Sequence, residues 1–158
     1  MRQRWVRVGV LAVVLFAIQV VARLVARFGF GDGTAEDLAA QERLSFVAWG
    51  VVALVAAVTA GWWVRLRPQS EVGGELAGGI GFGGLLSALL GPFVEEPPRF
   101  SDGVGGVIIE ATVLWGVAAL GAVIGSLILI AAGRDYRSQQ LRQFAEARSA
   151  RPRRPVRR

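Results

Sequence analysis

The sequence predicts an all-α, polytopic membrane protein with four transmembrane helices, arranged as two hairpins, and with both termini in the cytoplasm. Hydrophobic residues make up 53% of the 158-residue chain, and the mean hydropathy is +0.48. A helix rises about 1.5 Å per residue, so on the order of 20 apolar residues cross the hydrocarbon core of a bilayer. Four apolar blocks reach or approach that length: Val8 to Ala22, Leu44 to Val64, Leu76 to Val94 and Ala111 to Ala132.

These blocks divide the chain into two parts. Residues 1–133 form one transmembrane domain, with helices expected at about 5–28, 44–64, 74–94 and 106–132. Residues 134–158 form a basic cytoplasmic tail. We expect its first part to extend the fourth helix through Ala150 and its proline- and arginine-rich end to be disordered.

The first helix follows a basic segment that is typical of a secretory signal, with arginines at positions 2, 4 and 7. Arg23 and Arg27 come after the apolar run, and no small-x-small motif marks a cleavage site. We therefore expect an uncleaved signal anchor that stays in the protein as a helix.

The second helix has a start signal ahead of its apolar block. Thr34 and Asp37 fit a capping pattern, in which the hydroxyl accepts from the amide three residues on and the carboxylate reaches back. The helix is therefore expected to begin before it enters lipid. Ala53, Ala57 and Gly61 recur every four residues along it, a spacing that favours close helix packing.

Glycine dominates the third block and recurs in the fourth. A stripe of small residues every four positions lets another backbone approach closely in lipid. We expect the third helix to be enclosed by its neighbours and to bend or end near Pro92. We assign helix packing to six residues of these stripes: Gly79, Gly83, Ser87, Gly91, Gly121 and Gly125.

The second and fourth blocks contain near copies of one segment, Trp49–Leu54 and Trp115–Leu120, 66 residues apart. Such an echo indicates two like hairpins related by an axis along the membrane normal. Apolar sequence of low complexity also produces such echoes by chance, and the first and third blocks show no match. For Trp115, which lies inside its block, we expect packing between helices.

The arginines decide the predicted orientation. Fourteen of the 18 lie on one side of the four expected crossings, at positions 2, 4, 7, 65 and 67 and from 134 onward. The other side holds Arg23, Arg27, Arg43 and Arg99. By the positive-inside rule, both termini are cytoplasmic, and the default location is the cell membrane.

The composition disfavours catalysis and cofactor binding. Without cysteine or histidine there is no thiolate nucleophile, no Cys-ligated metal and no histidine base, and without lysine there is no Schiff base. We expect no enzyme activity, no cofactor and no metal. Glu71 and Glu75 lie near arginines at the predicted cytoplasmic surface. We interpret these two carboxylates as loop solvation or partial neutralisation of the arginines, not as a buried site.

Three polar residues are candidates for a functional track. Gln19 and Arg23 share one face of the first helix, and Glu110 lies at a matching depth in the fourth. They would line a path for an anion, a proton or the charged group of a partner. Alternatively, Arg23 and Arg27 extend to the headgroups while Glu110 lies at the interface. We favour this second interpretation.

The end of the tail is the candidate lipid contact. It carries five arginines in eight residues: Arg151, Arg153, Arg154, Arg157 and Arg158. Each is worth about 1 kcal/mol near an anionic membrane surface. No interleaved aromatics or folded platform accompany them, so no specific nucleic-acid binding is expected.

These features predict an accessory or structural subunit that packs through its Gly/Ala-rich helix faces against itself or another membrane protein. The expected contacts are the lipid bilayer and a membrane-protein partner or second copy. One alternative is a small oligomeric transporter or channel that uses Gln19, Arg23 and Glu110. Another is a membrane-tethered adaptor that works through the basic tail.

Overall fold

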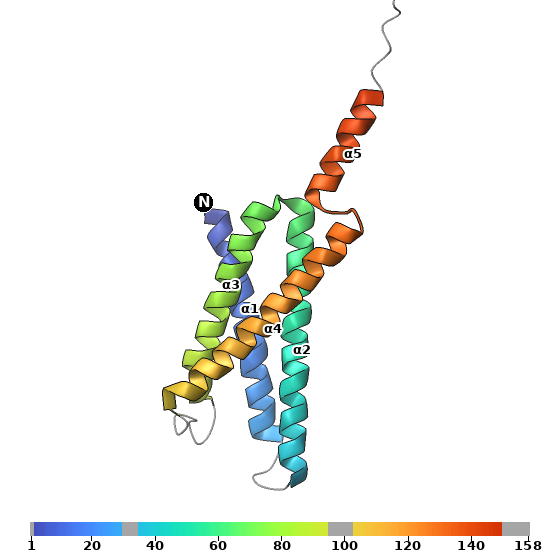
Figure 1. Ribbon diagram of the computed structural model, residues 1–158. Coiled ribbons are helices and arrows are strands. Elements are labelled where there is room, and N and C mark those ends of the chain that lie inside the picture. The colour runs from blue at the N-terminus through green and yellow to red at the C-terminus, as the bar shows by residue number, and fades with distance from the viewer. Residues whose placement is uncertain (1, 30–34, 95–102, 150–158) are drawn as a thin grey trace, which may run out of the picture.

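The computed structural model describes residues 2–29, 35–94 and 103–149. Over these ranges every regular element is helical, and four helices are long and apolar enough to cross a membrane. This confirms the predicted all-α class and the four long apolar helices (Figure 1). The elements are α1 (Arg2–Gly29), α2 (Ala35–Leu66), α3 (Gln69–Leu90), the 3₁₀ turn η1 (Gly91–Phe93), α4 (Gly103–Ala131) and α5 (Tyr136–Ser149).

The four long helices alternate in direction along the chain, but the closest packing is between helices that run in the same direction. α2 packs mainly against α4, and α1 packs mainly against α3 (Figure 1). A smaller contact joins α3 to α4, and another joins α1 to α2. Two hairpins related by an axis along the bundle would place α1 diagonally opposite α3. The packing therefore does not follow the two-fold relation that the near copies in α2 and α4 indicated.

Two ends of the bundle are distinguished by their charged residues. The tail end is where α1 begins and α2 ends, and it holds Arg4, Arg7 and Arg67. The loop end is where α1 ends and α4 begins, and it holds Arg23 and Glu110. Most of the buried side chains between the two ends are apolar, with Gln19 and Ser87 as buried polar residues.

Apolar side chains from the long helices form the buried core of the bundle. Leu15, Val52 and Val72 are at most 1% exposed, and alanines on α2 and α4 allow those two helices to approach closely. Trp115 packs against this core, as predicted for it.

The helix bounds differ from the predicted ones where local signals act. α2 begins at Ala35, well before its apolar block, with Glu36 and Asp37 in the first turn, where carboxylates complement the helix dipole. Thr34, the predicted cap, lies outside the described residues. α3 starts at Gln69 directly after Pro68 and ends at Leu90, because Pro92 lies in the following 3₁₀ turn.

The predicted extension of the fourth helix through Ala150 is wrong. Gly133 adopts a φ of 61°, its amide donates to the Ile130 carbonyl, and the next amide donates to Leu129, which closes α4 with a Schellman turn. A separate helix, α5, then begins beside Asp135, whose pKa is lowered by a side-chain hydrogen bond with Ser138. The five arginines of the tail lie outside the described residues.

Candidate functional site

The glycine stripe of α3 faces α1 within the same chain. A Cβ added at Gly79 would lie 2.7 Å from the Leu11 Cδ2 atom, and one at Gly83 would lie 3.1 Å from the Ala12 carbonyl oxygen. At Gly91 an added Cβ would collide with the guanidinium of Arg23. Glycine is therefore what lets α1 and α3 pack so closely.

The stripe of α4 makes the equivalent contact with α2. Added Cβ atoms at Gly121 and Gly125 would run into the backbone of Ala53 and Ala57, including their carbonyl oxygens. Backbone cannot move aside as a flexible side chain can. These four residues hold α2 and α4 at close range, and the small-residue faces predicted for helix packing are occupied inside the bundle.

At the loop end, the structure brings Arg23 and Glu110 together. An Arg23 Nη2 donates to Glu110 Oε1, the Arg23 side chain is 9% exposed, and that of Glu110 is 39% exposed. Arg27 donates from Nη1 to the Val94 carbonyl oxygen at 3.1 Å. Both arginines thus contact other helices or turns, in contrast to the arrangement that we favoured, in which they extend to the headgroups.

Gln19, the third residue of the predicted track, is 7% exposed and lies one turn from Arg23 on α1. Ser87 on α3 lies at the same level, because Gly83 contacts Leu15 and Gly91 contacts Arg23 on either side of it. Among the described residues, Gln19 Nε2 and Ser87 Oγ have no hydrogen-bond partner. The loop-end half of the bundle therefore contains a polar layer between α1 and α3.

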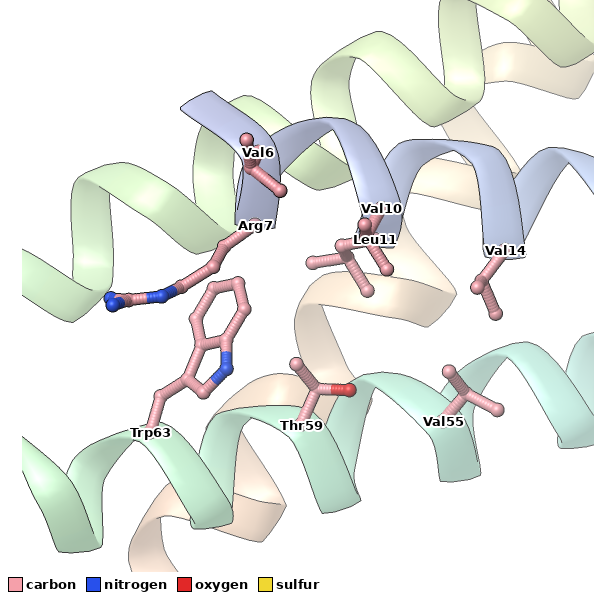
Figure 2. Close-up of a pocket in the computed structure, with 8 residues that line it drawn as sticks. All are labelled: Val6, Arg7, Val10, Leu11, Val14, Val55, Thr59 and Trp63. Atoms are coloured by element: carbon pink, nitrogen blue, oxygen red, sulfur yellow. The ribbon is translucent and has the colours of Figure 1, made fainter. Parts of the chain in front are cut away.

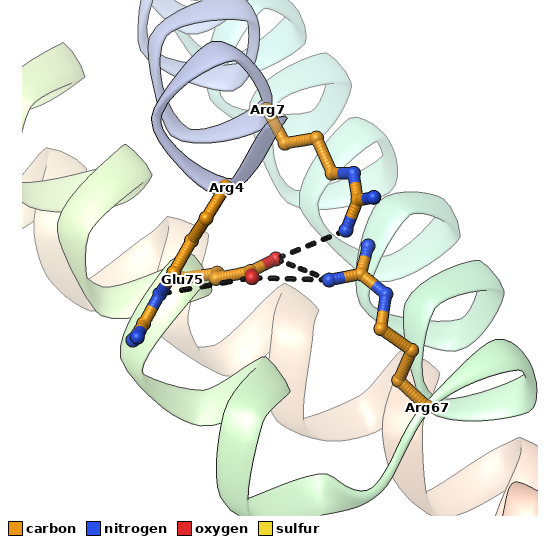
Figure 3. A network of polar contacts seen from close by, with 4 residues as sticks. All are labelled: Arg4, Arg7, Arg67 and Glu75. Carbon is orange, nitrogen blue, oxygen red and sulfur yellow. Dashed lines mark hydrogen bonds and ion pairs between the residues drawn. The ribbon is translucent and has the colours of Figure 1, made fainter. Parts of the chain in front are cut away.

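The tail end holds a charged cluster that the sequence interpretation missed. Glu75 is 2% exposed, and Arg67 donates from Nη1 to both of its carboxylate oxygens, at 3.0 and 2.9 Å. Arg4 Nε lies 3.7 Å from Glu75 Oε1, and Arg7 Nη1 lies 3.9 Å from Oε2 (Figure 3). Glu75 therefore partly neutralises the arginines, as one of our two interpretations expected, but it is a buried carboxylate, which corrects the expectation that it would not form a buried site.

Local structure explains why these four side chains meet. Glu75 shares a face of α3 with Val72 and Gly79, at the spacing of a buried helical stripe. The α2–α3 connection is so short that Arg67, whose amide donates to the Trp63 carbonyl oxygen at 3.0 Å, lies beside the first turns of α3. The position of Glu75 on this stripe was the available sequence signal.

Positive charge exceeds negative charge in this cluster. Three guanidinium groups face one carboxylate, so the cluster formed by Arg4, Arg7, Arg67 and Glu75 carries a formal charge of about +2. Arg67 is the most buried of the three arginines, with its side chain 20% exposed, against 35% for Arg7 and 58% for Arg4. We refer to these four residues as the Glu75 cluster.

Comparison with family models, curated proteins and solved structures gave no match. The chemistry of the site therefore rests on the residues described above. In the described part of the chain, no group of three or more acidic, histidine or cysteine side chains is placed to hold a metal ion. What the cluster can do is bind anions and hold helix ends together.

An apolar groove adjoins the Glu75 cluster between α1 and α2. Its volume is about 260 Å³. Figure 2 shows Arg7 and Trp63 at one end and Val14 and Val55 at the other. The complete lining is Val6, Arg7, Val10, Leu11, Val14, Val55, Thr59 and Trp63. The groove therefore joins a cationic end to an aliphatic channel on the outside of the bundle.

Proposed function

We propose that this chain is a multi-pass protein of the cell membrane that acts as an accessory or structural subunit. The observation that carries the proposal is a filled interior combined with an apolar exterior. Large apolar side chains project outward on all four long helices, among them Val13, Leu54, Leu85 and Ile124. An exterior of this kind suits lipid tails and neighbouring membrane helices as its surroundings.

The charges support cytoplasmic termini. Arg4, Arg7, Arg65 and Arg67 gather at the tail end of the bundle, and Arg134 follows α4 at the same end. Cytoplasmic loops and ends carry an excess of arginine, so this end would face the cytoplasm. Exposed Trp5 and Trp62 lie at that end as well, where indole rings favour the headgroup layer.

The small residues that no other helix of this chain covers indicate where a partner would bind. The stripes with Gly79 and Gly121 are occupied inside the chain, whereas a Cβ added at Gly81 would meet nothing within 4 Å. Together with Ala77, Phe82 and Leu85, Gly81 forms what we term the α3 outer face, which is exposed or half-buried. This face would let the helix of another membrane protein approach closely.

Purification tests the accessory role. The full chain is isolated in gentle detergent, and co-purifying proteins are identified and quantified. We expect a stoichiometric membrane-protein companion that Gly81→Ile removes. Gly50→Ile is the matched control, because Gly50 also has open space around it but lies on α2. A chain with no companion and no self-association, or equal losses with both variants, contradicts the proposal.

A small oligomeric transporter or channel is the second candidate. It is favoured by the polar layer, in which Gln19 and Ser87 are buried and the Arg23–Glu110 pair lies one turn further toward the loop end. Intramembrane polar groups often mark ion or proton pathways. Purification as a homo-oligomer without a companion, with proton or chloride flux in liposomes that Gln19→Leu abolishes, would favour this candidate over the accessory role.

A further inference from the structure

The outward-facing arginines of the Glu75 cluster have donors to spare. A guanidinium has five N–H donors, and Arg4 and Arg7 each make one long contact to Glu75, at 3.7 and 3.9 Å. Arg67 already satisfies both carboxylate oxygens at close range. Arg4 and Arg7 are also the two most exposed members of the cluster, so they can bind a second anion without releasing Glu75.

The groove begins at Arg7, and beyond it the lining is apolar apart from the hydroxyl of Thr59. From Val6 to Val14 it follows α1 over eight residue-to-residue steps, about 12 Å at the rise of a helix. Val6 and Val10 are each 58% exposed, so the groove opens to the outside of the bundle along its length. Its volume of about 260 Å³ suits a flexible hydrocarbon chain.

A ligand that satisfies both parts needs an anionic head and an aliphatic tail on the same molecule. We infer that the tail end holds one anionic phospholipid, with its phosphate on Arg4 and Arg7 and an acyl chain in the α1–α2 groove. A free phosphate would satisfy the arginines but leave the aliphatic groove unfilled. A phospholipid satisfies both the arginines and the groove, and the tail ends of α1 and α2 lie at the depth where lipid headgroups would meet the four apolar helices. Trp63 lies where the headgroup would join the acyl chain.

Glu75 has a defined role in this site. Guanidinium groups that lie together repel one another, and the buried carboxylate holds them at the helix ends before any lipid arrives. Because the cluster retains a formal charge of about +2 with Glu75 ionised, the phosphate is attracted despite the carboxylate. Glu75 is thus a positioning residue, while Arg4 and Arg7 are the binding residues.

The test is native mass spectrometry of the purified full chain in detergent, titrated with phosphatidylglycerol or with phosphatidylcholine of the same acyl chains. Arg7→Gln removes a binding charge and leaves Arg67 on Glu75, and Arg65→Gln is its control, an exposed arginine at the same end. Val10→Trp fills the groove, and Val13→Trp is its control, an equally exposed valine of α1 outside the groove.

We expect one phosphatidylglycerol to be retained in preference to phosphatidylcholine. Arg7→Gln should weaken phosphatidylglycerol binding about fivefold and leave phosphatidylcholine unchanged, as expected for one arginine near an anionic headgroup. Val10→Trp should weaken both lipids, because it blocks the acyl chain. The two control variants, Arg65→Gln and Val13→Trp, should bind as the unaltered chain does.

Four results would overturn the inference. Equal losses for Arg7→Gln and Arg65→Gln would mean general surface attraction, and full binding by Val10→Trp would mean that the groove is not used. Displacement of the lipid by an equal concentration of glycerol 3-phosphate would identify a free phosphate site. A lipid-free dimer that Val10→Trp dissociates would assign the groove to a second copy of the chain.

Discussion

Replacing Glu75 with glutamine is the most informative single change to this protein. The substitution keeps the shape of the side chain and removes its charge, which leaves the arginines of the Glu75 cluster without a counter-charge. Removing one partner of a buried ion pair costs about 3–5 kcal/mol when the other charge stays buried. The structure narrows this range of energies, because the side chains of the three arginines differ in exposure.

Arg67 accounts for most of the expected loss. Its side chain is 20% exposed and it makes both close hydrogen bonds to Glu75, so it cannot easily find water. Arg4 and Arg7, at 58% and 35% exposure, can turn outward, and ion pairs of this kind are worth at most about 1 kcal/mol. We therefore expect Glu75→Gln to lower the free energy of unfolding by about 2–3 kcal/mol.

The assay is unfolding of the full chain in mild detergent by titration with dodecyl sulfate, followed by tryptophan fluorescence and circular dichroism. Glu71→Gln is the control, since Glu71 lies one turn earlier on α3 and is exposed, and it should change stability by less than about 0.5 kcal/mol. The double variant Arg67→Gln/Glu75→Gln should regain at least half of the loss, because the buried unpaired charge is then gone.

Two outcomes would refute this reasoning. One is a Glu75→Gln protein whose stability matches that of Glu71→Gln. The other is a double variant no more stable than Glu75→Gln alone, which would mean that an unpaired Arg67 was not the source of the loss.

Three further predictions concern other parts of the bundle. Gly121→Ala should cost about 1–3 kcal/mol in the same titration because its Cβ meets a carbonyl of α2, whereas Gly116→Ala, in open space, should cost nothing. Charge reversal at Arg23 or Glu110 alone should lower thermal stability, and the double reversal should restore it; a double variant no better than either single one contradicts the pair. The hydrogen bond with the Ser138 hydroxyl lowers the pKa of Asp135 from its ordinary value of 3.8. At pH values above 3.8 this bond should stabilise α5, and the stabilisation should be lost as the pH falls through the lowered pKa. Hydrogen exchange of α5 amides should show this loss, and Asp135→Asn should abolish the pH dependence.

The long apolar helices could be predicted because hydropathy is a property of consecutive residues. The end of α4 at Gly133 could also have been predicted, since glycine after an apolar run commonly ends a helix. The matched depths of Arg23 and Glu110 followed from the rise of a helix. Whether those two side chains face each other depends on helix rotation, which apolar sequence does not encode strongly.

The Glu75 cluster shows what local sequence cannot provide. Arg4 and Arg7 lie about 70 residues before Glu75 in the chain, and only the packing of α1 against α3 brings them together. Hydropathy placed Glu75 near a surface, which is correct for its depth along α3. Its position on the stripe with Val72 and Gly79 indicated a buried face, but which side chains cover that face depends on the neighbouring helices.

The packing of like-directed helices has a consequence for biogenesis. Ribosomes deliver α1 and α2 first, yet the main packing partners of these two helices are α3 and α4, which emerge later. With the proposed insertion into a membrane, this first half would wait in the bilayer with its closest-fitting surfaces against lipid. α3, the least apolar of the four candidate spans, would then gain a docking site on α1 as it left the translocation channel. A nascent chain halted after α2 would lack the partners that complete its fold and would be a substrate for membrane quality control.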